Sequence, residues 1–387
     1  MRAALTVLAI WLVSLGAAAQ FGKFAVLFDR LAAAYPEQSL PLVGMIVSTV
    51  GFVGLILGTT AGLFVSALGY KRVMIAALLA GAAISAVEAL MPPLPVMVAL
   101  RALEGVSHLA LVVAAPVLTA QLAGPRWQAA AMSLYSSFFA VSFASLGALG
   151  PVLAGWGGLP AVLLAHAGYL LAGAALLAAL LPDLPRAALP PLSARGLLVA
   201  HRHIYANPRE AAPAMGFVCY TFTFVAFLTL MPQQYLGRPE QFLLASLMPL
   251  VSVGTALTLG VWAMGRISAV RLVQAGFALA IGFAALLWLS WGQGAAILAA
   301  FGVSAGLGLV QSASFATIAQ LNDSAEARAR AAGAIAQLGN LGTTFGTPVL
   351  VWLLAGYAET GLVLFLTGFS LLGIALHAVQ ARRRISG

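Results

Sequence analysis

The sequence carries little charge and has a single cysteine. Asp, Glu, Lys and Arg together make up 7% of the 387 residues, whereas a soluble domain carries roughly 25%. Hydrophobic residues make up 62% of the chain, and the mean hydropathy is +1.02. This composition predicts an integral membrane protein. The one cysteine, Cys219, lies inside an apolar run, which excludes a disulfide within the chain and a CxxC metal site.

Several motifs that would carry chemistry are also missing. The five histidines show no metal-ligand spacing such as HExxH, and no Gly-Lys-Ser/Thr loop of the ATP-binding kind is present. No nucleophile, metal set or paired carboxylate stands at a spacing useful for catalysis. The net charge of +9 lies in short clusters between apolar runs, which argues against nucleic acid as a partner. We therefore expect neither an enzyme nor an ATP-driven pump, and no metal or other cofactor.

The apolar runs are long enough to cross a bilayer as helices, which takes about 20 residues each. They lie at residues 4–31, 41–64, 73–91, 95–121, 129–153, 161–182, 211–231, 241–263, 271–290, 295–319, 332–356 and 361–380. Residues 1–20 imitate a signal peptide, but the apolar run continues to Leu31, so we expect a first membrane span instead. The predicted fold is an all-α polytopic membrane protein with twelve transmembrane helices.

A weak internal repeat divides these spans into two sets of six. Three triplets recur in the same order at offsets of 197 to 199 residues: Gly105–Ser107 with Gly302–Ser304, Ala120–Leu122 with Ala319–Leu321, and Pro151–Leu153 with Pro348–Leu350. Many transporters are built from such a duplication. We expect two pseudo-symmetric six-helix bundles, at residues 1–182 and 211–387, joined by a linker rich in Pro and Arg at 183–210. A short basic tail would end the second bundle.

The distribution of Lys and Arg predicts the orientation in the membrane. If the N-terminus is cytoplasmic, 15 of the 19 basic residues lie inside, and only Arg30 and Arg238 lie outside. Lys23 and Arg101 fall within spans. We therefore expect both termini and the linker on the cytoplasmic side of a cell membrane, such as the bacterial inner membrane.

The loop between the second and third spans runs from Gly62 to Arg72 and resembles a signature of the major facilitator superfamily. That signature is Gly-x-Leu-Ala-Asp-Arg-x-Gly-Arg-Arg/Lys, and Gly62, Gly69 and Lys71 match it. Ser66 stands where the family usually has Asp, and Ala67 and Tyr70 also depart from the pattern. The resemblance implies that the loop helps to hold the two halves in one state. The residues assigned to this gating motif are Gly62, Gly69, Lys71 and Arg72. The alternative is a basic cytoplasmic loop after a tight turn.

Two further patterns resemble the same family. Arg101 and Gly105 match an Arg-x-x-x-Gly pattern in the fourth span, and the resemblance implies a role for Arg101 in proton coupling or substrate binding. Gly150 and Pro151 in the fifth span resemble the Gly-Pro motif of family exporters, which implies close packing and a helix bend. Ordinary packing of small residues is the alternative for Gly150 and Pro151.

Asp, Glu, Lys and Arg well inside the spans are few, and all belong to the first half. Each costs at least ~2.5–3.5 kcal/mol to insert, so it needs a partner or a wet cavity. Arg101 and Glu104 are three residues apart and share a helix face. We predict that they carry a proton, with His108 one turn further along as a possible relay. A fixed ion pair and a packed neutral histidine are the alternatives. Glu88 lies near a span end and is interpreted as a boundary residue.

The candidate substrate site combines Lys23 with uncharged groups. Gln20, Phe24 and Phe28 recur every four residues and are expected on one face of the first span. The second half contributes polar residues at Tyr220, Gln311 and Asn340. The alternatives are that Lys23 snorkels outward and that the phenylalanines face lipid or pack in the core.

These features together predict a secondary active transporter of a small organic solute that works by alternating access and is driven by protons. The Gly-Pro motif favours export of an amphipathic compound, whereas Lys23 and Arg101 against Glu104 leave one excess positive charge that favours an organic anion. The expected partners are the solute, protons and the lipid bilayer, and a monomer is expected. The alternative is a non-transporting membrane receptor or assembly factor, with which the altered loop motif is compatible.

Overall fold

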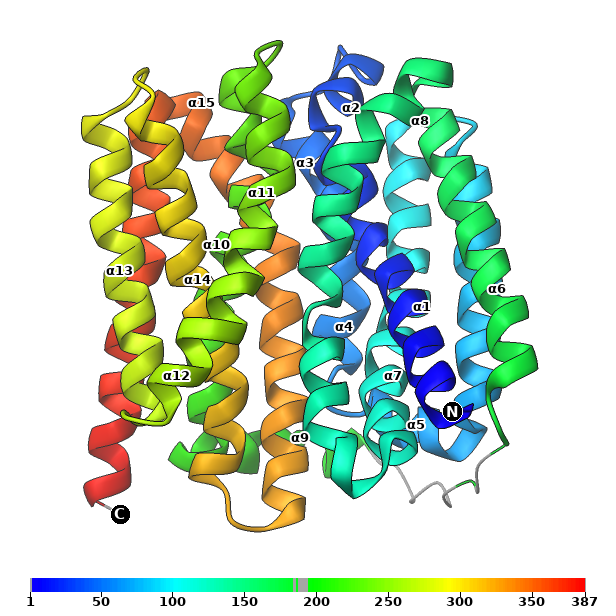
Figure 1. The fold of residues 1–387 in the computed structure, drawn as a ribbon, viewed down its shortest axis with the longest axis vertical. Coiled ribbons are helices and arrows are strands. Elements are labelled where there is room, and N and C mark those ends of the chain that lie inside the picture. Colours follow the sequence, from blue (N-terminus) through cyan, green and yellow to red (C-terminus); the bar gives the residue numbers. More distant parts are fainter. Residues whose placement is uncertain (1, 184–185, 187–193, 387) are drawn as a thin grey trace. The chain divides into compact units, whose positions relative to one another are not determined.

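The structure is a computed structural model that describes residues 2–183, 186 and 194–386. Within these residues the regular secondary structure is entirely helical (Figure 1). The α-helices are α1 (Arg2–Ala25), α2 (Phe28–Ala34), α3 (Leu40–Ser48), α4 (Phe52–Leu57), α5 (Ala61–Leu68), α6 (Tyr70–Glu88), α7 (Leu94–Ser136), α8 (Phe138–Leu180), α9 (Ala194–Ala206), α10 (Pro208–Leu230), α11 (Pro239–Thr255), α12 (Val261–Met264), α13 (Ala269–Leu289), α14 (Ala295–Leu321) and α15 (Ala325–Ser386). Short 3₁₀ segments cover Thr49–Gly51 and Pro232–Tyr235, and a π-helical turn covers Ala256–Gly260.

The described helices contain enough apolar length for twelve crossings of a membrane. Ten stretches are long and apolar enough to span. Two of them, in α8 and α15, are 43 and 59 residues long, and each is at least twice as long as the roughly 20 residues that one crossing needs. Each is divided by non-helical backbone, α8 at Gly157 and Gly158 and α15 at Ala358. The ten stretches therefore make twelve crossings, which confirms the predicted all-α membrane fold.

The first predicted span is not one continuous helix. α1 ends at Ala25 and α2 begins at Phe28, with Leu27 between them in a non-helical conformation (φ −110°, ψ 36°). The second predicted span is likewise interrupted, by the 3₁₀ turn at Thr49–Gly51 and again before α5. Breaks of this kind release backbone groups that other side chains can then bind.

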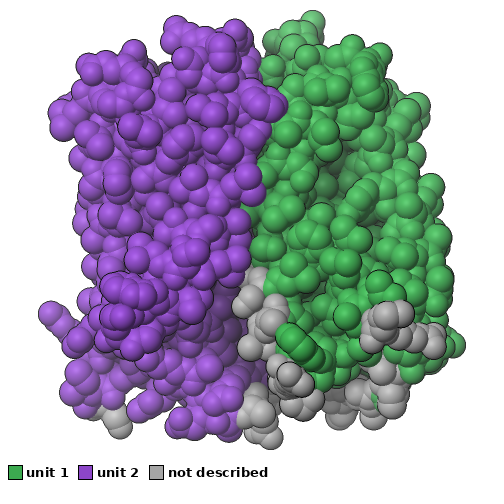
Figure 2. Space-filling model, viewed as in Figure 1, with its two compact units in different colours: residues 1–54, 60–190 green, residues 55–59, 191–387 purple. Residues whose placement is uncertain are grey.

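The chain divides into two compact units, which Figure 2 colours separately. Unit 1 comprises residues 1–54 and 60–190, and unit 2 comprises residues 55–59 and 191–387. In unit 1, α1 packs against α7 and α8, and α6 also packs against both. A buried core that includes Ile10, Met74 and Leu170 joins these helices. The unit is thus held together by helices from opposite ends of its sequence.

Unit 2 is held together by close approach of small residues. α10 packs along α15, where a Cβ at Gly342 or Gly346 would clash with the α10 backbone. Gly308 of α14 lies equally close to the backbone of Ser252 in α11. Without a hydrophobic driving force in lipid, such contacts are the main source of helix association.

The predicted linker at 183–210 falls partly on residues 184–185 and 187–193, which lie outside the described residues. Its later part contains α9 and the start of α10. Asn207 caps α10 by accepting a hydrogen bond from the backbone N–H of Arg209 at 2.9 Å. The proposed boundaries of the two bundles and the linker stay a prediction.

Candidate functional site

Lys23 lies at the centre of a buried charge cluster in unit 1. Its Nζ is 2.5 Å from Glu88 Oε2 and 2.7 Å from Glu104 Oε1. The same ammonium donates to Ser85 Oγ at 3.1 Å. An ammonium has three N–H donors, and each has an acceptor here. Lys23 is therefore paired between α6 and α7 and does not snorkel outward.

Arg101 completes the cluster from α7. Its Nη1 is bonded to Glu104 Oε2 and lies 3.6 Å from Glu88 Oε1. The remaining donors reach backbone carbonyls: Nε donates to Ile46 O at 2.7 Å and Nη2 to Gln20 O at 2.5 Å. The planar guanidinium thus ties α7 to α1 and α3 through fixed directions that a lysine does not offer. We call Lys23, Glu88, Arg101 and Glu104 the charge quartet.

The quartet is fully buried and electrically balanced. All four side chains are 0% exposed, and two cations face two carboxylates. Burying charges is costly unless each is paired and hydrogen-bonded, and this geometry meets that condition. Glu88, interpreted as a boundary residue, is a buried member of the quartet, and its carboxylate removes the excess positive charge that was inferred without it.

The burial of Glu88 has a local cause. It is the last residue of α6, where a carboxylate often reaches water. Here the chain folds back directly, because the N–H of Met91 donates to Glu88 O at 2.9 Å. Tyr35 then closes over this turn, donating to Pro92 O at 2.7 Å. Burial and the nearby Glu88 carboxylate raise the pKa of Tyr35 to about 12, so its hydroxyl stays a donor.

Phe24 and Gln20 lie beside the quartet on α1. The Phe24 ring centroid is 4.9 Å from the Arg101 guanidinium and 5.5 Å from Lys23 Nζ, so its π face is turned to both cations. Gln20 donates to Ser107 Oγ at 3.0 Å, and its buried Oε1 has no hydrogen-bond partner among the described residues. Phe28 begins α2 beyond the helix break, so the four-residue spacing does not place it on the α1 face.

His108 is directed to the α1 backbone. Its Nδ1 lies 2.9 Å from Ala17 O, and its ring packs edge-on against Phe21 with centroids 5.0 Å apart. A carbonyl only accepts, so Nδ1 carries the proton. This contact matches the alternative of a packed histidine. Within the described residues, no hydrogen bond joins His108 to Arg101 or Glu104, and the proton relay stays a prediction.

A polar branch that the sequence analysis did not assign leads away from Lys23. Ser85 Oγ lies 3.1 Å from His166 Nδ1 and 2.9 Å from Leu163 O. His166 Nε2 lies 3.0 Å from Gly16 O. Ser85 is three residues before Glu88 and so shares its helix face. His166 is an ionisable residue inside a predicted span. The spacing of Ser85 from Glu88 and the place of His166 in a span are the two sequence signals that could have identified this branch.

Tyr220, Gln311 and Asn340 stand on three different helices of unit 2: α10, α14 and α15. The Tyr220 ring is stacked between Phe217 and Phe224, with centroids 5.2 and 5.0 Å away. Its buried hydroxyl has no hydrogen-bond partner within the described part of the chain. Asn340 donates to Ala336 O of its own helix at 2.7 Å, and Gln311 is partly buried. Their role in solute binding stays a prediction.

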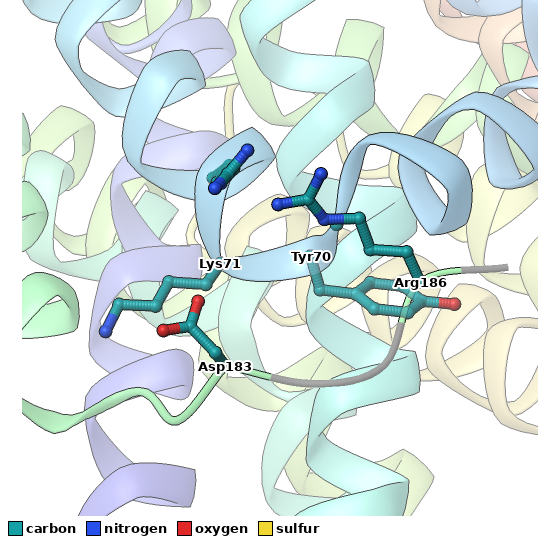
Figure 3. A pocket seen from close by; sticks show the side chains of 6 residues that line it. Tyr70, Lys71, Asp183 and Arg186 are labelled. Atoms are coloured by element: carbon teal, nitrogen blue, oxygen red, sulfur yellow. The ribbon is translucent and has the colours of Figure 1, made fainter.

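The loop motif forms a small pocket of about 10 Å³ at one end of unit 1. Gly69 lies between α5 and α6 with φ +95°, a conformation that favours glycine. Figure 3 shows the side chains of Tyr70, Lys71, Asp183 and Arg186, which line the pocket. The loop lacks the family's usual acid at Ser66, and Asp183 brings an acid to it from elsewhere in the sequence.

The other residues of the two predicted motifs make looser contacts. Arg72 also lines the loop pocket and is exposed. Gly62 is exposed on α5, and a Cβ there would make only ordinary contact with Val113. Gly150 packs against Leu27, and α8 continues as helix through Pro151. These contacts match ordinary packing of small residues, and the predicted bend stays a prediction.

Comparison with known proteins agrees with this architecture. The chain resembles a bacterial homologue of the human lysosomal transporter Spinster in its inward-facing, unoccupied conformation (TM-score 0.78, 13% identity, 98% of this chain and 97% of that one). It also resembles the human organic anion transporter MFSD10 (TM-score 0.71, 18% identity, 97% and 99%). At these identities the likeness shows the fold. No curated protein sequence matches the chain. The sequence model of the Major Facilitator Superfamily matches residues 3–347, and the chain therefore belongs to that family of membrane transport proteins.

Proposed function

We propose that this protein is a secondary active transporter that moves a small organic solute by alternating access and couples this movement to protons. The observation that carries the proposal is the charge quartet, which is fully buried and has no net charge when all four groups are ionised. Retaining four ionisable groups in a membrane span is expensive, and such groups commonly mark proton and substrate pathways.

The two carboxylates differ in how firmly they are held. Glu104 is paired with both Lys23 and Arg101, whereas Glu88 Oε1 is buried without a hydrogen-bond partner among the described residues. A proton added at Glu88 Oε1 breaks no hydrogen bond. The carboxylates share Lys23, so we treat them as one coupled proton site and not as separate titrating groups.

The charge balance sets a rule for coupling. One added proton leaves the quartet with a charge of +1 in a site that tolerates little net charge. A monovalent organic anion bound beside it restores neutrality, so an anion and a proton bind together, as in symport. An organic cation instead competes with the proton, as in antiport. MFSD10 is an organic anion transporter, and the Spinster homologue is related to a human lysosomal transporter. For this chain, the charge balance of the quartet replaces the earlier argument for an organic anion, which assumed one excess positive charge.

We further propose that the protein acts as a monomer in a cell membrane, with both termini in the cytoplasm. The asymmetry of Lys and Arg supports that orientation. A receptor or assembly factor without transport would need only a fixed quartet. Family membership supports the transporter instead.

Solute flux in proteoliposomes tests the proposal. Purified protein is screened by counterflow against a panel of organic anions and lipophilic cations, and then an inward pH gradient is imposed. We expect either the anions or the cations to exchange. The pH gradient should then drive an anion in the same direction as the protons, or a cation in the opposite direction. A matched control is Glu37→Gln, which removes an exposed carboxylate of unit 1 and should leave the flux unchanged. A folded protein that exchanges no compound of either class would favour the receptor.

A further inference from the structure

The polar branch formed by Ser85 and His166 joins the charge quartet through Lys23. Ser85 Oγ is 3.1 Å from Lys23 Nζ and 3.1 Å from His166 Nδ1. Ser85 and the quartet are 0% exposed, whereas His166 keeps 6% of its surface accessible. The imidazole is therefore the most accessible member of this chain of contacts.

The contacts of His166 identify its tautomer. Nε2 faces the carbonyl of Gly16 at 3.0 Å and must carry a proton, since a carbonyl only accepts. In the neutral ring Nδ1 is then an acceptor. The Ser85 hydroxyl has one proton and two acceptors within reach, His166 Nδ1 at 3.1 Å and Leu163 O at 2.9 Å. It can turn from one acceptor to the other without moving its oxygen.

This arrangement can hold an additional proton without losing a hydrogen bond. If a proton binds Nδ1, the ring donates to Ser85 Oγ, and the Ser85 hydroxyl turns to donate to Leu163 O. The bond from Nε2 to Gly16 O is unchanged. The proton comes from water, one Nδ1–H bond forms, and no bond within the protein breaks. Each donor keeps an acceptor in both protonation states, as burial requires of polar groups.

The charges around His166 decide when that proton binds. Lys23 on α1 shares the Ser85 hydroxyl with the ring, and in the quartet it contacts Glu88 on α6, which lies 3.6 Å from Arg101 on α7. Lys23 Nζ and His166 Nδ1 both lie 3.1 Å from Ser85 Oγ, so they are at most about 6 Å apart. Two cations sharing one hydroxyl oxygen repel, and the ring stays neutral while Lys23 occupies this position. If Lys23 leaves, the quartet is left with two carboxylates and one arginine, and its charge is −1.

We propose that His166 is a reserve proton site of the transporter, which stays neutral while Lys23 donates to Ser85 and takes a proton when Lys23 withdraws. His166 then supplies the missing positive charge beside Ser85, and the site returns to neutrality. The inference deepens the proposed function and rests on it, since Lys23 withdraws when it binds a solute anion or when the quartet opens. His166 reaches the quartet through Ser85 and Lys23.

Titration of the imidazole tests the proposal without a transported solute. The protein is labelled with ¹⁵N-histidine in lipid nanodiscs, and the His166 signal is assigned with His166→Gln. We expect the wild-type ring in the Nε2–H tautomer. Lys23→Met should raise the midpoint of its titration by about 2 pH units, from the repulsion of one charge about 6 Å away at an effective dielectric constant of about 20. Lys23→Arg keeps the charge and should leave the midpoint near that of the wild type.

A second pair of variants covers the case in which Lys23→Met does not fold. The double variant Lys23→Met/Glu88→Gln leaves Arg101 paired with Glu104 and keeps the site neutral. It is compared with Glu88→Gln alone, so that only the lysine differs. We expect a higher midpoint in the double variant. An equal or lower midpoint there, or an unchanged one in folded Lys23→Met, would overturn the inference. Absence of solute flux would instead contradict the proposed function, and this titration does not depend on it.

Discussion

Glu88 Oε2 lies 2.5 Å from Lys23 Nζ, and both side chains are fully buried. Lys23 is shared, because its ammonium also contacts Glu104 Oε1 at 2.7 Å. One cation thus links two carboxylates that stand on separate helices, α6 and α7. A change in the protonation of either carboxylate alters the partners of the other, which is the physical basis of the predictions that follow.

Glu104→Gln and Glu88→Gln should each uncouple transport from protons. Glutamine imitates the protonated acid permanently, so the quartet keeps a charge of +1 at every pH. We expect solute counterflow to persist and uptake driven by a pH gradient to be lost. Both fluxes are measured on the same proteoliposomes, with Glu37→Gln as the control. Gradient-driven uptake that survives in both variants would make the quartet a structural element only.

Arg101→Ala should damage both coupling and folding. It removes a guanidinium that bonds Glu104, Gln20 O and Ile46 O, and it leaves buried acceptors without a donor. Breaking a buried ion pair from one side typically costs about 3–5 kcal/mol. We expect a clear loss of thermal stability in detergent. The loss should be larger than for Glu88→Gln, because Glu88 makes one close ion pair, with Lys23, and lies 3.6 Å from Arg101.

Arg101→Lys separates the charge of this residue from its geometry. The lysine keeps one positive charge but not the planar fork that reaches two backbone carbonyls. Stability between that of the wild type and Arg101→Ala is the expected result. Arg238→Ala removes an exposed arginine and is the matched control. Equal stability of all four proteins would show that Arg101 does not join the helices.

Lys23→Gln should weaken binding of an anionic solute. It removes the cation nearest the two carboxylates and leaves the quartet with a charge of −1, which repels an anion. We expect a higher dissociation constant for an anion identified by counterflow, and little change for a neutral analogue. Arg238→Gln is the control, since it removes an exposed cation outside the quartet. Unchanged anion affinity in a folded Lys23→Gln protein would remove Lys23 from the solute site.

Much of the charge quartet could be predicted from the sequence, because charge inside a membrane span is rare. Lys23, Arg101 and Glu104 stood out for that reason, and the spacing of Arg101 and Glu104 predicted their pairing. Glu88 was placed at the membrane boundary because depth was counted along a straight helix. The turn after α6 and the hydrogen bond from the Tyr35 hydroxyl to Pro92 O depend on the tertiary structure, so counting residues along a helix cannot reveal them.

Other features had no local signal. The break between α1 and α2 occurs at Val26 and Leu27, where neither glycine nor proline interrupts the apolar run. Phe28 therefore follows Phe24 by four residues in the sequence, but it does not share a helix face with Phe24 in the structure. The contact of Ser85 with His166 joins residues 81 positions apart, and Asp183 and Gly69, which line the same pocket, are still further apart in the sequence. Pairings at that distance are decided by how the helices pack.

The orientation in the membrane can be tested by labelling single cysteines. In a background of Cys219→Ala, Arg195→Cys in the linker should react with an impermeant maleimide only after the membrane is opened. Arg238→Cys, after the seventh predicted span, should react in intact cells. The reverse pattern would overturn the predicted topology. Labelling of both in intact cells would show leakage of the reagent, and the comparison would be repeated in sealed vesicles of known orientation.

Tyr35→Phe should loosen the cover over Glu88 and alter the dependence of stability on alkaline pH. The variant loses the hydrogen bond to Pro92 O, which costs about 1 kcal/mol. In the native protein the pKa of Tyr35 is raised from 10.0 to about 12 by burial and by the Glu88 carboxylate. The folded state therefore holds this proton where the unfolded chain has lost it. The resulting contribution is fully present below pH 10 and disappears as the pH rises towards 12. Thermal unfolding from pH 8 to 12 should show a shallower alkaline decline in Tyr35→Phe than in the wild type. Parallel declines would mean that Tyr35 reaches solvent and does not close the turn above Glu88.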